Sequence, residues 1–152
     1  MNNRRIILKD LFFVIFYTAV LSILFGIILA FIDYYLQIAI HFTFANLLFL
    51  MIAIYIGKTI RGVVKSPHII YSIIAGIGMF VSWLIIVTLP SLYAFGLSLQ
   101  TPLIILNIRY YFNTAIDLFN PLSFISNFSF DYLISMLILG VGCYLGISRT
   151  IR

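Results

Sequence analysis

The sequence predicts an all-α fold: an integral membrane four-helix bundle with an additional extracytoplasmic, interfacial amphipathic helix. Three observations predict it. The 152 residues are 64% hydrophobic and 9% charged, with a mean hydropathy of +1.20, whereas ordinary soluble domains are about 45–50% apolar and about 25% charged. The apolar residues form four long runs, and eight of the nine Lys and Arg residues lie in three short segments outside those runs.

The four runs predict transmembrane helices within a single transmembrane domain that covers residues 1–152. They lie at about residues 11–32, 38–57, 69–90 and 131–148. A helix of 22 residues is about 33 Å long, which matches a hydrocarbon core of about 30 Å. Strands of a membrane β-barrel would alternate between apolar and polar residues, and these runs do not. The chain is therefore expected to cross a bilayer four times.

The basic residues predict how the chain is oriented. With four spans, the N-terminal segment, the turn at 57–68 and the C-terminal segment fall on one side. Cytoplasmic segments are enriched in Lys and Arg, so both termini and this turn are expected in the cytoplasm, next to the anionic headgroups of a bacterial plasma membrane. Because these cations lie at the ends of apolar runs rather than on one polar face, nucleic acid is not expected as a partner. The orientation residues are Arg4, Arg5, Lys9, Lys58, Arg61, Lys65, Arg149 and Arg152.

The segment 103–119 predicts a helix in the outer membrane interface. A fifth span here would instead place Arg109 in the bilayer, at a cost of about 2.5–3.5 kcal/mol. One half of the helical surface is apolar, which is typical of a helix that lies flat on a membrane. The helix is either a lid between the third and fourth spans or an outward surface that receives a partner or a substrate. Its polar half carries Asn107, Arg109, Tyr110, Asn113, Thr114 and Asp117.

Small residues at four-residue spacing predict close contacts between the helices. Such faces let helix backbones approach in lipid, where no hydrophobic effect drives helices together. They serve either packing within one bundle or contacts with another membrane protein or a second copy of the chain. Asn46, expected near the middle of the second span, would form a hydrogen bond to a neighbouring helix. The small residues are Thr18, Ser22, Gly26, Ala30, Ser72, Gly76, Gly78, Ser82, Gly142 and Gly146.

A further set of polar residues is expected at the outer ends of the spans: Asp33, His41, Arg109, Asp117 and Asp131. Asp33 and His41 flank the expected turn between the first two spans. Together the five residues form either an outer ionic cluster that His41 makes responsive to pH, or separate groups hydrated among the headgroups.

No motif in the sequence predicts catalysis, a cofactor or a metal. The chain has no Glu and a single cysteine, Cys143, and it contains no H-E-x-x-H, P-loop or G-x-S-x-G pattern. His41 and His68 are expected on opposite faces of the membrane, where they cannot share a metal ion. A lipid-modifying enzyme ranks third among the interpretations because only the outer Asp residues support it.

Two segments carry a resemblance to known proteins: YIGKTIRGVVKSPHIIYSIIAGIGMFVSW (55–83) and DYLISMLILGVGCYLGISR (131–149). They resemble the membrane part of small bacterial four-helix transmembrane proteins of unassigned function, which implies the same topology without an activity.

The residues favour a non-enzymatic subunit or accessory factor of a membrane complex. The alternative is a small oligomeric transporter or channel whose pathway uses polar residues of the spans and of the outer segment. The first three expected spans have no internal proline, which counts against the broken helices of many transporters. The pathway residues are Asp33, His41, Asn46 and Arg109.

Overall fold

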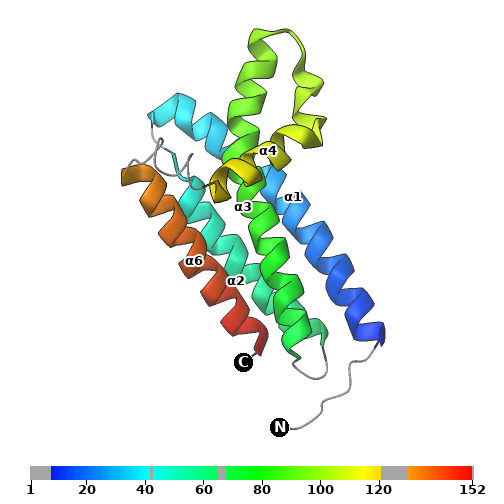
Figure 1. Cartoon of the computed structure of the whole chain (residues 1–152). Coiled ribbons are helices and arrows are strands. Elements are labelled where there is room, and N and C mark those ends of the chain that lie inside the picture. Colours follow the sequence, from blue (N-terminus) through cyan, green and yellow to red (C-terminus); the bar gives the residue numbers. More distant parts are fainter. Residues whose placement is uncertain (1–7, 42, 65–67, 121–129, 152) are drawn as a thin grey trace.

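The computed structural model describes residues 8–41, 43–64, 68–120 and 130–151, and the regular elements in this part of the chain are helices (Figure 1). They are α1 (Leu8–Ile40), α2 (Ala45–Val63), α3 (Ile69–Ser98), the short 3₁₀-helix η1 (Pro102–Leu106), α4 (Ile108–Phe119) and α6 (Phe130–Ile151). By length and apolarity, α1, α2, α3 and residues 133–151 of α6 qualify to cross a membrane. The prediction of an all-helical chain with four such helices is confirmed.

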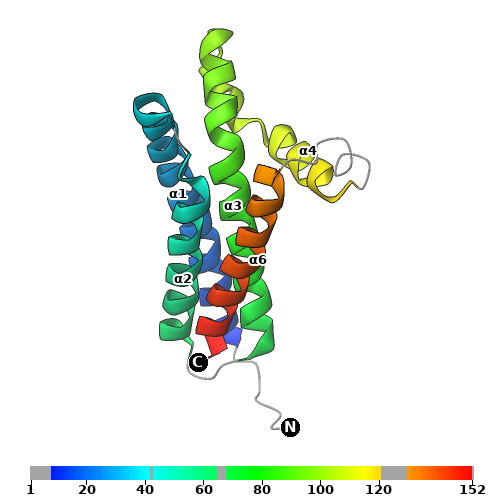
Figure 2. The same ribbon diagram turned by 90° about the vertical axis from the view of Figure 1, so that its left-hand side faces the viewer.

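The four long helices lie side by side in a bundle (Figures 1 and 2). The most extensive contacts join α3 to α1 and α6 to α2, and α3 also contacts α2 and α6. Successive long helices run in opposite directions, so α1 and α3 begin, and α2 and α6 end, at the same end of the bundle. We call this the basic end, because Lys9, Lys58, Arg61 and Arg149 lie near it. At the opposite end, the α4 end, α3 extends beyond the other helices and α4 runs across the bundle.

The turn between α1 and α2 lies later in the chain than the sequence predicts. The predicted spans place it at residues 33–37, whereas α1 ends at Ile40 and α2 begins at Ala45. Residues 33–40 contain no glycine or proline, so they continue the helix of α1. The same correction moves Asn46 from the expected middle of a span to the first turn of α2. Hydropathy locates an apolar run, whereas the ends of a helix depend on the groups that cap them.

α3 continues for eight residues past Pro90, where the sequence predicts the end of the third span. The prediction that the first three spans have no internal proline is therefore wrong for α3. Because proline has no N–H, the carbonyl oxygen of Ile86 lacks its usual helical donor. Residues 69–98 include no charged side chain, so α3 stays apolar on both sides of this interruption.

The predicted interfacial helix at 103–119 is divided into η1 and α4 by Asn107. This residue has an extended backbone (φ −79°, ψ 98°), and its side-chain oxygen accepts a hydrogen bond from the Arg109 N–H at 3.2 Å. Asparagine is among the preferred N-cap residues. The Tyr111 hydroxyl donates to the Ile105 carbonyl at 3.0 Å and joins α4 to η1. Burial raises the pKa of Tyr111, so this hydroxyl keeps its proton.

Small residues line the contacts between the helices. A β-carbon on Gly57 of α2 would collide with the backbone of Gly146 on α6, and one on Gly78 of α3 would collide with Thr18 of α1. The helices therefore approach each other more closely here than larger residues permit. Of the small residues predicted on packing faces, Gly76 is partly buried, and the buried ones are Thr18, Ser22, Gly26, Ala30, Ser72, Gly78, Ser82, Gly142 and Gly146.

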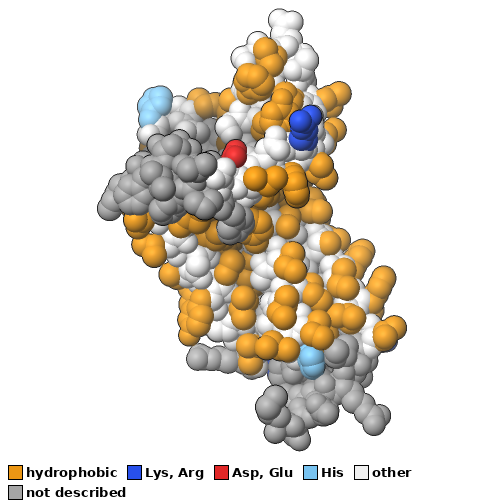
Figure 3. Space-filling model, viewed as in Figure 1, with side chains coloured by type: hydrophobic (Ala, Val, Ile, Leu, Met, Phe, Trp, Pro, Cys, Tyr) orange, Lys and Arg blue, Asp and Glu red, His pale blue; other side chains and the backbone are white. Residues whose placement is uncertain are grey.

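The core is formed mainly by residues of α2 and α3, with residues of α1 and α6 packed against them. Its largest buried side chains include those of Phe49, Ile56, Tyr71 and Met79. Apolar side chains also cover much of the outer surface of the bundle (Figure 3). Water disfavours such a surface and lipid tolerates it. The long helices thus carry apolar residues both on the side that faces the core and on the side that faces outward.

Candidate functional site

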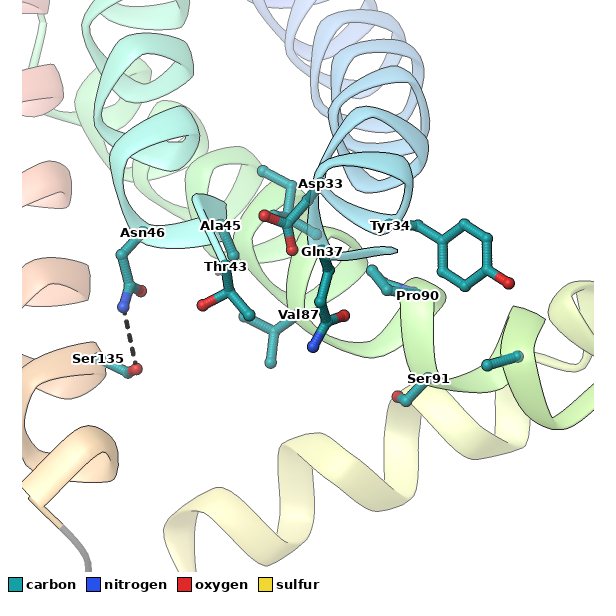
Figure 4. Close-up of a pocket in the computed structure, with 12 residues that line it drawn as sticks. Asp33, Tyr34, Gln37, Thr43, Ala45, Asn46, Val87, Pro90, Ser91 and Ser135 are labelled. Atoms are coloured by element: carbon teal, nitrogen blue, oxygen red, sulfur yellow. Dashed lines mark hydrogen bonds between the residues drawn. The ribbon is translucent and has the colours of Figure 1, made fainter. Parts of the chain in front are cut away.

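A cavity of about 410 Å³ lies at the α4 end of the bundle (Figure 4). It is bounded by α1, the beginning of α2, the second half of α3 and the beginning of α6. Polar side chains are costly within a membrane bundle and are associated there with binding and transport, so this cavity is the candidate site. Its polar lining residues are Asp33, Tyr34, Gln37, Thr43, Asn46, Ser91 and Ser135, and its apolar ones are Ala45, Ile86, Val87, Pro90 and Ala94.

Asp33 connects α1 to the beginning of α2 at the cavity. The residue is only 3% exposed, and its Oδ1 accepts a hydrogen bond from the Phe44 N–H at 2.6 Å. The Ala45 N–H also donates to this carboxylate. The first N–H groups of a helix have no partner within the helix, and a carboxylate also complements the partial positive charge at a helix N-terminus. These contacts explain why α2 begins at Ala45.

Asn46 connects α2 to α6 on another side of the cavity. Its Nδ2 donates to the Ser135 hydroxyl at 3.2 Å (Figure 4), which is a hydrogen bond between helices of the kind that the sequence predicts. The Oδ1 of Asn46 is buried and has no hydrogen-bond partner within the described part of the chain. A buried acceptor without a donor is costly, so this amide has an unused hydrogen-bonding capacity beside the cavity.

The α3 wall of the cavity contains the hydrogen bond that Pro90 interrupts. Ile86 and Pro90 both line the cavity, and Ile86 is fully buried in the wall. Ser91 donates its hydroxyl to the Thr88 carbonyl at 2.9 Å and keeps its lone pairs available. A proline inside an apolar run is a signal that sequence reasoning can use, but it is easily misread as the end of a span.

Of the residues predicted to form an outer polar cluster, one lines the cavity. Asp33 lines the cavity, but His41, Arg109 and Asp117 are not among its lining residues. All three are exposed, His41 at the turn after α1 and the other two on α4. Asp131 lies in α6, and its side chain is outside the described residues. The lining residues that sequence reasoning missed come from three helices and a turn, without a shared spacing: Gln37, Thr43, Ser91 and Ser135.

The basic residues that predict orientation lie at the other end of the bundle. Lys9, Lys58 and Arg149 are exposed, and Arg61 donates to the Val64 carbonyl at 3.3 Å. The described part of the chain therefore carries four cations and the buried Asp10 at the basic end, and the buried Asp33 with Arg109 and Asp117 at the α4 end. The remaining orientation residues lie outside the described residues: Arg4, Arg5, Lys65 and Arg152.

The cavity lining combines one carboxylate with hydroxyl and amide groups. Among its described lining residues Asp33 is the one carboxylate, and no His, Lys, Arg or Cys accompanies it. Over the described ranges of the chain, no three His, Cys, Asp or Glu side chains gather in a way that could hold a metal ion. The lining residues can form hydrogen bonds to a solute.

Comparison with known proteins adds no assignment to this cavity. No protein-family model, curated protein or solved structure matches the chain. The resemblance of residues 55–83 and 131–149 to small bacterial membrane proteins stays a prediction. The four apolar helices and the polar cavity between them are therefore the observations from which a function has to be inferred.

Proposed function

We propose that the chain is a non-enzymatic subunit or accessory factor of a complex in a bacterial cytoplasmic membrane, and that it binds a small polar solute in the cavity at its α4 end. One observation carries the proposal: seven polar lining residues, one of them a buried carboxylate, meet between four helices that are long and apolar enough to cross a membrane. Polar groups within a membrane bundle are energetically costly, and where they occur they usually have a function. Purification in mild detergent as a monomer with no co-purifying protein would contradict the subunit role.

In this proposal the basic end faces the cytoplasm and the α4 end faces outward, because cytoplasmic ends of membrane helices are rich in Lys and Arg. α2 has 19 residues and α6 has 22, which correspond to about 28 and 33 Å and match the hydrocarbon thickness. α1 and α3 are longer, with 33 and 30 residues. Helices of this length cross a bilayer by tilting or by extending beyond it.

α4 lies in the outer interface in this arrangement. Its Ile108, Phe112 and Ile116 form an exposed apolar stripe, and Arg109 and Asp117 are exposed on the polar side of the same helix. A helix with these two faces buries its apolar side at the boundary of the acyl chains and keeps its charges among the headgroups. α4 thus borders the membrane next to the cavity.

Cysteine labelling of intact cells tests the orientation. In a Cys143→Ala background, Asn113→Cys is expected to react with a membrane-impermeant thiol reagent, and Lys58→Cys is expected to react only after the cells are opened. Both positions are exposed in the structure, so the difference reports the side of the membrane rather than burial. Labelling of Lys58→Cys from outside, with Asn113→Cys protected, would reverse the topology.

The same labelling tests whether the cavity opens to the outer side. Ala94→Cys lines the cavity and is expected to react from outside, because water reaches it. Ile77→Cys is the matched control on the same helix: its side chain is exposed in the structure, but lipid covers it and excludes a charged reagent. Reaction at Ile77→Cys without reaction at Ala94→Cys would contradict both the membrane placement and the accessible cavity.

A small oligomeric transporter or channel is the second candidate. Pro90 favours it, because interrupted helices border the substrate sites of many transporters and supply free carbonyl oxygens there, and Pro90 lines this cavity. A transporter releases its solute at the basic end, whereas a binding subunit holds it at the α4 end. Uptake by liposomes that contain the chain therefore separates the two candidates.

A further inference from the structure

We propose that the solute held in the cavity is a small organic cation, a protonated primary amine with a short apolar part. This inference rests on the proposed function and adds the chemical class of the ligand. Asp33 supplies the charge, and the Ser91 hydroxyl oxygen of α3 supplies a further acceptor. The argument uses three properties of the cavity: its charge, its acceptors and its size.

The cavity has a negative charge with no positive side chain to oppose it. Asp33 is the charged residue among the described lining residues. The N–H groups of Phe44 and Ala45 use two of the roughly four acceptor positions of its carboxylate. The α2 N-terminus carries about half a positive charge, which offsets only part of the carboxylate charge. The remaining negative charge and the remaining acceptor positions both favour a cationic donor (Figure 4).

The α3 wall adds an acceptor rather than a donor. Pro90 leaves the Ile86 carbonyl oxygen without a helical N–H, but Ile86 is fully buried, so the exposed Ser91 is the accessible acceptor of this wall. Ser91 already donates its proton to the Thr88 carbonyl, so it faces a ligand as an acceptor. A primary ammonium group has three N–H donors and no acceptor. Its needs match a carboxylate and a hydroxyl oxygen.

The size of the cavity favours an organic cation over a bare metal ion. A volume of about 410 Å³ falls within the roughly 300–1,000 Å³ of small-molecule sites. A metal ion with direct protein ligands would leave most of this volume empty. Ala45, Val87 and Ala94 form apolar parts of the lining that suit a short alkyl chain. The cavity therefore accommodates the charged group and the carbon chain of one molecule.

Protection of a cavity cysteine tests the ligand class. The chain with Cys143→Ala and Ala94→Cys is placed in nanodiscs, and its rate of reaction with N-ethylmaleimide is measured by mass spectrometry. n-Butylammonium is expected to slow the reaction in a saturable manner, whereas n-butanol and butyrate at the same concentration leave the rate unchanged. Ala94→Cys leaves Asp33 and Ser91 in place, so the reporter does not remove the groups under test.

Two variants test the roles of the named groups. Asp33→Asn keeps a side-chain oxygen that can accept from the Phe44 N–H but removes the charge, so we expect binding of n-butylammonium to weaken about tenfold. Ser91→Ala removes the hydroxyl acceptor of α3 and is expected to weaken binding as well. The matched control is Asp117→Asn, which removes an exposed carboxylate of α4 outside the cavity and leaves binding unchanged. Thermal unfolding shows that each variant is folded.

The outcomes separate this inference from the proposed function. Equal protection by n-butanol, or full protection retained in a folded Asp33→Asn variant, would contradict the proposal that the ligand is a cation. Either result would leave the proposal of solute binding intact. If none of the three compounds slows the reaction of Ala94→Cys, the proposal that the ligand is a cation would also be contradicted. A cysteine at this position that never reacts in the folded protein would contradict the open cavity, and with it the proposed function.

Discussion

Gly57→Ala is expected to destabilise the bundle by about 3 kcal/mol, because overpacking at a rigid contact costs about that much. The added β-carbon would meet the carbonyl oxygen and carbon of Gly146 on α6. Both are backbone atoms, so no side-chain rotation relieves the collision, and the axes of α2 and α6 have to separate. This separation would also disturb Asn46 and Ser135, which join the same two helices beside the cavity. The midpoint of unfolding by sodium dodecyl sulfate, followed by circular dichroism in mixed micelles, measures the loss.

Gly62→Ala provides the matched control on the same helix. A β-carbon at Gly62 meets no atom within 4 Å, so alanine only removes the conformational freedom of glycine, which stabilises a helix by about 0.5–1 kcal/mol. Gly140→Ala on α6 has the same open surroundings and the same expected result. Equal unfolding midpoints for Gly57→Ala and Gly62→Ala would contradict the close crossing of α2 and α6.

Gly78→Ala is expected to cost about 2 kcal/mol, and Thr18→Ala is expected to restore most of that loss. The β-carbon added at Gly78 of α3 would collide with the Thr18 methyl group of α1. Thr18 is 4% exposed, and a β-branched side chain in a helix has few rotamers with which to move away. Its hydroxyl has no hydrogen-bond partner within the described chain, so removing the side chain deletes the collision and an unsatisfied group together.

A double-mutant cycle measures this contact. The unfolding free energies of Gly78→Ala, Thr18→Ala and the double variant are compared, and residues in direct contact show interaction energies of about 0.5–3 kcal/mol. The expected coupling is favourable, with the double variant more stable than Gly78→Ala alone. Strictly additive effects would mean that Thr18 and Gly78 do not meet, and that α1 packs on α3 in another register.

Features that depend on the summed hydropathy and charge of a segment could be predicted from the sequence. The apolar runs and the scarcity of charge predict the four long helices, because the cost of exposing apolar surface to water accumulates residue by residue. The small residues on the first and third spans also predict close packing faces. The sequence does not show that Thr18 faces Gly78, or that Gly57 faces Gly146, because the pairing depends on which helices become neighbours.

The ends of the helices were less readable, because single contacts decide them. α1 continues past the predicted turn, and α2 begins where the Asp33 carboxylate accepts the Phe44 and Ala45 N–H groups. α3 continues past Pro90 although it loses a hydrogen bond there. Asn107 divides the expected interfacial helix because its side chain caps α4. Each of these helix ends depends on a few local hydrogen bonds, which hydropathy does not describe.

The sequence by itself determined that this chain forms long apolar helices and that its basic residues gather outside them. Hydropathy and charge are properties of a segment, and they do not depend on which other segments lie beside it. Only the tertiary structure decided that one cavity is surrounded by Asp33, Asn46, Pro90 and Ser135. Each of these residues comes from a different helix, and the sequence does not show how the four helices pack. Hydrogen-bonding groups act over about 3 Å, so their function depends on which helices the packing brings together.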